Sequence, residues 1–234
     1  MKSPEIYQQP LTSQTYRWEL SLDFSQNLAG LEEDKTIEVL KSLIDDSKNF
    51  LGAGGVGKVY DTGDQCIKLI INRSNSVNSH LFDLGNDVSM EFEIQKRLQD
   101  FEHQGVFSPN VVGYYEGNET NAIVMEKLDA VNMQMVINGK EELPASFDLD
   151  DFFWRLERYI DEIHCEFGIL HLDLEPRNIM IDCATGNPRV IDFGRSRLVS
   201  DDDPSFDVMA KKDFNEIEKA YKKMKDYLDK INKI

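Results

Sequence analysis

Cysteines are few and long apolar runs are missing from this sequence. The three cysteines, Cys66, Cys165 and Cys183, form no C-x-x-C pair. Neither a disulfide framework nor a zinc site is therefore expected. No apolar stretch approaches the roughly 18 residues that a membrane helix needs, and the first ten residues lack the apolar core of a secretory signal. These absences predict a protein of the reducing cytoplasm, without a membrane span.

Positive charge is also scarce. The 234 residues contain 26 Lys and Arg against 43 Asp and Glu, a net charge of −17. That balance disfavours nonspecific binding of nucleic acid. The last 24 residues differ, because they carry eight lysines against five acids. They predict an amphipathic helix with a solvated basic face, or alternatively a surface for an anionic ligand or an activating partner.

The most informative segment places an acid and an amide on one loop between two apolar runs. Asp173 precedes Asn178 by five residues, and a second acid, Asp192, begins an Asp-Phe-Gly segment further on. A carboxylate in such a loop can accept a hydroxyl proton, and Asp and Asn oxygens are ligands that Mg²⁺ prefers. The alternative is that these residues are ordinary turn formers.

A glycine-rich segment and a lysine in an apolar strand lie earlier in the chain. Leu51–Val59 contains Gly52, Gly54 and Gly57, and lack of Cβ atoms would let its backbone approach phosphates closely. Lys68 follows inside the apolar run 66–71, where a charge needs a partner. Glu91 on the next predicted helix is the favoured partner, and Glu93 is the alternative.

Together, and in this order, these segments resemble the protein kinase-like superfamily over residues 45–195. The resemblance implies an α+β, two-lobed fold with an N-terminal extension over 1–44, a small β-sheet N-lobe over 45–126 and a minimal C-lobe over 127–234. The C-lobe is expected to be short because 40 residues follow Gly194 and no Ala-Pro-Glu segment occurs among them. Compact KEOPS-type, RIO, lipopolysaccharide and bacterial secreted effector kinases are similar in this respect.

The resemblance also implies roles for individual residues. Asp173 would orient the acceptor hydroxyl, and Lys68 with Glu91 would hold phosphates. Glu175 stands where the family usually has Lys, and Arg177 would restore the positive charge beside the transferring phosphate. Mg²⁺ or Mn²⁺ would be held by Asn178 and Asp192. ATP would be bound between the lobes by Gly52, Ala53, Gly54, Gly57, Val59, Lys68, Glu126 and Leu128.

The expected reaction is phosphate transfer to a protein, with serine or threonine as the favoured acceptor. A small-molecule, lipid or sugar kinase and a nucleotide-binding pseudokinase scaffold remain alternatives. Leu172 stands where the family usually has Arg, so control by activation-loop phosphorylation is not expected. Secretion into a host cytosol is the alternative location if the protein is a bacterial effector.

Hydrophobic periodicity predicts helices over 31–44, 88–103, 149–167 and from about 204 to the end, with residues 1–30 irregular. Strands are predicted over 49–51, 58–60, 66–71, 111–115 and 122–126. The second helix is expected to bury Met90, Ile94, Leu98 and Phe101. The last helix is expected to bury Phe214, Ile217, Tyr221, Met224, Leu228 and Ile231.

Overall fold

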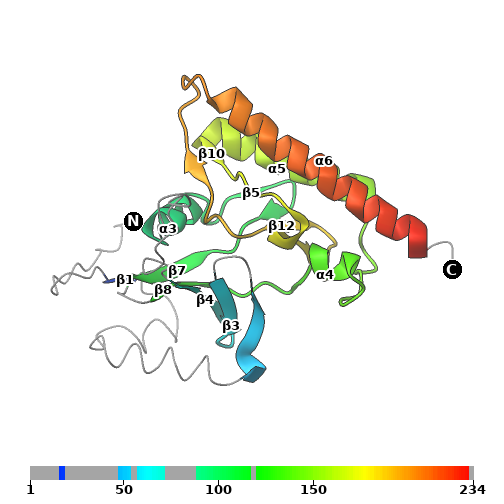
Figure 1. The fold of residues 1–234 in the computed structure, drawn as a ribbon, viewed down its shortest axis with the longest axis horizontal. Helices are drawn as coiled ribbons and strands as arrows, with labels where there is room; N and C mark the ends of the chain where they lie inside the picture. Colours follow the sequence, from blue (N-terminus) through cyan, green and yellow to red (C-terminus); the bar gives the residue numbers. More distant parts are fainter. Residues whose placement is uncertain (1–15, 19–46, 54–56, 72–87, 117–119, 232–234) are drawn as a thin grey trace, which may run out of the picture. The chain divides into compact units, whose positions relative to one another are not determined.

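The computed structural model describes residues 16–18, 47–53, 57–71, 88–116 and 120–231 (Figure 1). The predicted helix over 31–44 and the predicted ligand Gly54 lie outside these residues. Helices and small sheets both occur, which confirms the α+β class. No helix among the described residues is long and apolar enough to cross a membrane.

The chain forms two compact units. The first comprises Met1–Glu93 and Asn110–Lys127, and the second comprises Ile94–Pro109 and Leu128–Ile234. The predicted boundaries of the extension and the two lobes stay a prediction.

A six-stranded antiparallel sheet dominates the described part of the first unit. Its order is β1 (Tyr16–Trp18), β7 (Val111–Glu116), β8 (Thr120–Glu126), β4 (Gln65–Ile71), β3 (Gly57–Asp61) and β2 (Phe50–Ala53). A short 3₁₀ turn, η1 (Ser47–Asn49), precedes β2. The expectation that residues 1–30 are irregular is wrong at β1, which pairs with β7. Three residues carry too little periodicity to reveal a strand whose structure comes from its partner.

Alternation along β4 sends successive side chains to opposite faces of this sheet. Cys66 and Ile70 share one face, where they pack with Val88 and Phe92 from the start of α3 (Val88–Arg97). Lys68 lies between them on the same strand face. This register is why a lysine in an otherwise apolar strand reaches the helix.

Helix α3 ends six residues before the predicted end at His103. Asp100 takes a left-handed backbone conformation with φ of 59°, which a short polar side chain tolerates. The chain then forms β5 (Glu102–His103), which pairs with β6 (Val106–Phe107). Met90 is 42% exposed instead of buried, because the buried face of α3 carries Glu91 in its place.

The second unit is built around α5 (Leu149–Phe167), whose bounds match the prediction. The side chain of Asp148 caps its first turn, and Gly168 ends it in a left-handed conformation with φ of 62°. A Cβ on Gly168 would lie 2.5 Å from the Val199 carbonyl oxygen, so glycine is required there.

Helix α6 (Phe206–Ile231) lies alongside α5 (Figure 1). Ile231 is exposed, contrary to the prediction.

Short strands complete this unit and flank the segments that carry Asp173, Asn178 and Asp192. One sheet has the order β5, β6, β12 (Pro188–Val190), β11 (Ile179–Asp182) and β9 (Ala130–Asn132), and β10 (Ile169–Leu170) pairs with β13 (Arg197–Leu198). The connection predicted over 129–147 contains β9 and α4 (Met133–Ile137). The 3₁₀ turn η3 (Pro176–Asn178) leads directly into β11.

Candidate active site

The loop between β10 and β11 brings Asp173 and Asn178 into contact. The Asn178 Nδ2 group donates to the Asp173 carbonyl oxygen at 2.8 Å and to Asp173 Oδ2 at 3.0 Å. Only the NH₂ end of the amide can donate both bonds, so the network fixes the amide orientation. Both residues are buried. The Asn178 amide oxygen is therefore directed away from Asp173.

Asp213 on α6 holds the start of this loop. Its carboxylate accepts hydrogen bonds from the backbone N–H of His171 at 2.8 Å and of Leu172 at 2.7 Å, and contacts His164 Nε2 at 3.0 Å. Leu172 has φ of 63°, an uncommon conformation for a residue with a branched side chain. The sequence prediction missed Asp213. The available signal was an acid one helical turn before Ile217, on the apolar face of the predicted helix.

His171 serves as a structural link within the loop. Its Nε2 lies 3.1 Å from the Ile191 carbonyl oxygen, the Asp173 backbone N–H points at its Nδ1 at 3.3 Å, and its ring packs on Phe193. Burial lowers the pKa of His171, which keeps the ring neutral. A neutral ring that donates from Nε2 and accepts at Nδ1 satisfies both contacts.

Two arginines reach the Asp173 carboxylate. Arg177 Nη2 lies 3.1 Å from Oδ2 and 3.3 Å from Oδ1, while its Nη1 lies 3.2 Å from a Glu175 oxygen. Arg195 Nη1 lies 3.3 Å from Asp173 Oδ1. Arg177 is thus placed beside both acids of the loop. Arg195 was not among the predicted residues, although its position directly after Gly194 was a visible signal.

Pairing of β11 with β12 brings the backbone of the two predicted metal ligands, Asn178 and Asp192, close together. The Ile191 backbone N–H donates to the Asn178 carbonyl oxygen at 3.1 Å, so Asp192 follows directly beside Asn178. Asp192 itself has a left-handed φ of 67°. Such outliers concentrate at functional sites.

An amide oxygen and a carboxylate fit Mg²⁺, which prefers hard oxygen ligands and keeps several waters or phosphate oxygens. Asn178 and Asp192 are the residues that would hold it. No cluster of three His, Cys, Asp or Glu side chains suited to a metal occurs within the described ranges.

In the first unit, Lys68 and Glu91 form a buried ion pair. The Lys68 Nζ lies 2.7 Å from Glu91 Oε1, and the two side chains are 7% and 2% exposed. Glu93, the alternative partner, is exposed. Removing two charges from water is costly unless they pair with good geometry, so each residue explains the burial of the other.

The described part of the glycine-rich segment comprises the end of β2 and the start of β3. Gly52 and Ala53 end β2, Gly57 begins β3, and Val59 packs against the same cluster as α3. A Cβ on Gly57 would lie 2.5 Å from the Leu69 carbonyl oxygen, so the pairing of β3 with β4 requires glycine there. A Cβ on Gly52 would meet no atom of the described residues within 4 Å. Space for a close ligand is thus present at Gly52.

Glu126 ends β8 with its backbone N–H already engaged. That group donates to the Asn110 carbonyl oxygen at 2.8 Å, so the Glu126 N–H has its partner within the first unit. Cys66 Sγ lies 3.7 Å from the Glu126 carbonyl oxygen, and burial raises the pKa of its thiol to about 12. Cys66 is therefore a small apolar residue, not a reactive thiol. Leu128 opens the following segment of the second unit.

A buried Lys–Glu pair on an antiparallel sheet and an Asp–Asn loop followed by Asp-Phe-Gly define the protein kinase-like class. The protein kinase domain family model matches residues 46–218. The chain belongs to the protein kinase domain family.

Curated relatives are similar at low identity. A probable serine/threonine-protein kinase of Corynebacterium efficiens is 28% identical over 159 residues, which are 64% of this chain and 23% of the relative. The serine/threonine-protein kinase mos of Patiria pectinifera is 25% identical over 151 residues, which are 64% of this chain and 42% of the relative. The chain thus spans less than half the length of these relatives. A solved structure of WbdD matches 69% of this chain and 36% of its own, with TM-score 0.49 and 20% identity.

Proposed function

We propose that this chain transfers the γ-phosphate of ATP, in the presence of Mg²⁺ or Mn²⁺, to a serine or threonine hydroxyl of a protein. One observation carries the proposal: the Asp173 carboxylate is held in place by Asn178 on one side and flanked by the Arg177 guanidinium. In the proposed step the acceptor oxygen bonds to the γ-phosphorus as the bond to the bridging oxygen of ADP breaks. The hydroxyl proton passes to Asp173.

Other residues have supporting roles in this proposal. Lys68, held by Glu91, and the backbone of Gly52, Ala53, Gly54 and Gly57 would bind phosphates, with Val59, Glu126 and Leu128 at the adenine. Asn178 and Asp192 would hold Mg²⁺, which neutralises phosphate charge when bound. Arg177 would offset the repulsion that Glu175 exerts on the transferring phosphate. The ion pair between these two side chains supports that role.

A protein acceptor and a cytoplasmic location are parts of the proposal. Two curated relatives bear the names of serine/threonine-protein kinases, which supports the acceptor. The boundaries 1–44, 45–126 and 127–234 are the proposed extension and lobes. The scarcity of cysteine supports the location.

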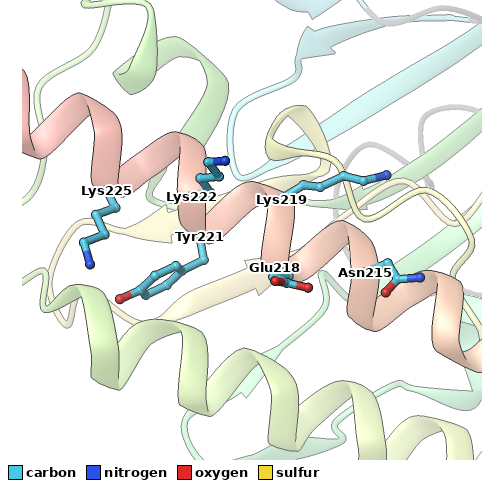
Figure 2. A pocket seen from close by; sticks show the side chains of 6 residues that line it. All are labelled: Asn215, Glu218, Lys219, Tyr221, Lys222 and Lys225. Atoms are coloured by element: carbon cyan, nitrogen blue, oxygen red, sulfur yellow. The ribbon is translucent and has the colours of Figure 1, made fainter.

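We also propose that the lysine-rich part of α6 binds an anionic partner. A pocket there is lined by Asn215, Glu218, Lys219, Tyr221, Lys222 and Lys225, and Figure 2 shows these side chains spread along one stretch of the helix. Three lysines and one acid line it; Lys219 pairs with Glu216 at 2.7 Å, and Lys222 and Lys225 supply the further positive charge. Titration with inositol hexakisphosphate would test this proposal. Loss of saturable binding in Lys222→Glu supports it, whereas no saturable binding to the unaltered chain contradicts it.

The phosphotransfer proposal is tested with γ-labelled ATP and a cell lysate as the source of acceptors. Label on proteins that requires Mg²⁺ or Mn²⁺ and is lost in Asp192→Ala supports it. Label only on small molecules would move the acceptor to the metabolite, lipid or sugar class. Binding of ATP without any transfer would indicate a pseudokinase scaffold or a missing activator.

A further inference from the structure

The two oxygens of the Asp173 carboxylate are held unequally. Oδ2 accepts from Asn178 Nδ2 at 3.0 Å and from Arg177 Nη2 at 3.1 Å. Oδ1 has two longer contacts within the described part of the chain, each of 3.3 Å, to Arg177 Nη2 and Arg195 Nη1. Oδ1 is therefore the oxygen that an acceptor hydroxyl can reach by displacing the least.

We infer that Arg195 is a specificity-determining residue, which leaves Oδ1 when an acceptor binds and pairs with an Asp or Glu adjacent to the acceptor serine or threonine. The inference rests on the proposed function and names its substrate class. In the free protein Arg195 occupies the place of the acceptor hydroxyl. In the complex the acidic acceptor replaces Asp173 as its partner.

Displacement of Arg195 is inexpensive. Its side chain is 60% exposed, and a single long contact joins it to Asp173. Asp173 itself is buried and keeps its shorter contacts to Asn178 and Arg177, so loss of this one contact leaves the carboxylate paired. Arg177 differs because it contacts both oxygens of Asp173 and also pairs with Glu175. The acceptor would therefore exchange with Arg195 and leave Arg177 in place.

An acidic acceptor also explains why a cation at this position matters. The chain has a net charge of −17, so an acidic peptide is repelled unless a local positive charge receives it. Arg177 already has two acids beside it. Among the described residues Arg195 contacts the acid Asp173 alone, and that acid would be turning to the acceptor hydroxyl. The Arg195 guanidinium is then the cation available to the acceptor.

Arg197 provides a matched control two residues further along. Its guanidinium donates to the Ser196 carbonyl oxygen at 3.4 Å, and it forms no ion pair within the described part of the chain. It therefore shares the charge and neighbourhood of Arg195 but not the contact with Asp173.

The experiment compares serine peptides that are identical except for acidic, neutral or basic residues on both sides of the serine. Unaltered protein should prefer the acidic peptide. Arg195→Ala should lose about tenfold of that preference through KM, and Arg195→Glu should prefer the basic peptide, with KM for ATP unchanged. Arg197→Ala should keep the original preference. Thermal melting would verify that each variant is folded.

The outcomes separate this inference from the proposed function. The inference is contradicted if Arg195→Ala and Arg195→Glu transfer phosphate with the same peptide preference as the unaltered protein. That result leaves the proposed function standing. An equal loss of preference in Arg197→Ala also contradicts it, because the effect would then be general charge. Failure to phosphorylate any peptide or lysate protein contradicts both.

Discussion

The carboxylate of Asp213 accepts a 2.7 Å hydrogen bond from the backbone N–H of Leu172, a residue in a left-handed conformation. The same carboxylate accepts a bond from His171. A helix residue far along the chain thereby fixes the backbone immediately before Asp173. The position of Asp173 depends on α6 as well as on its own loop.

Asp213→Ala should destabilise the protein by roughly 2–5 kcal/mol, because it removes the acceptor of the buried His171 N–H and of the partly buried Leu172 N–H. Urea unfolding measures this change. Asp226→Ala, an exposed acid on the same helix, should change stability by no more than about 0.5 kcal/mol. Equal effects of the two substitutions would show that Asp213 does not hold the loop.

Lys68→Met should lower stability by roughly 3–5 kcal/mol, since it deprives the buried Glu91 of its cation. Lys68→Met/Glu91→Leu should recover a good part of that loss, because neither charge remains buried. Both variants should lose binding of ATP. Denaturant unfolding and nucleotide titration separate the two effects. A double variant less stable than the single would contradict the pairing.

Arg177→Ala should lower kcat by about 10–100-fold, because the positive charge beside Asp173 is lost while Glu175 remains. Adding Glu175→Gln should restore part of the rate by removing the repelling acid. Steady-state kinetics at saturating ATP measure both. If Arg177→Ala leaves kcat unchanged, its contact with Asp173 has no part in transfer.

The free energy of unfolding should decrease as pH is lowered below about 6.5, and protonation of His171 should account for part of that decrease. Burial lowers the pKa of His171 in the folded chain. Just below the ordinary pKa of histidine, His171 is therefore protonated in the unfolded chain and neutral in the folded chain. The stability that neutral His171 contributes is fully present above the ordinary pKa of histidine. It is lost as pH decreases below that value. His171→Gln should flatten the dependence of melting temperature on pH between 7 and 5. An unchanged slope would indicate that other groups cause the fall.

Features set by local sequence were predictable. The bounds of α5 followed from a long apolar periodicity. A charge inside an apolar strand indicated that Lys68 needs a partner, and the family resemblance pointed to Glu91. The order of motifs identified the family. Local pattern also located the loop that carries Asp173 and Asn178.

Features set by distant contacts were not predictable. β1 exists because β7 pairs with it, and Asp213 is buried because a loop 41 and 42 residues earlier offers two N–H donors. The end of α3 depends on a left-handed Asp100, which its sequence allows but does not demand. In each case the deciding partner lies elsewhere in the chain.

Transfer of label from γ-labelled ATP by the unaltered protein and by Asp173→Asn tests the central claim most directly. The Asn side chain keeps the size of Asp173 but cannot accept the proton, so transfer to protein should fall by at least about 100-fold with ATP binding retained. Melting temperature would confirm that the variant is folded. Transfer by Asp173→Asn at the rate of the unaltered protein would contradict the assignment of Asp173. ATP binding without transfer by the unaltered protein, to any acceptor, would contradict the proposed activity.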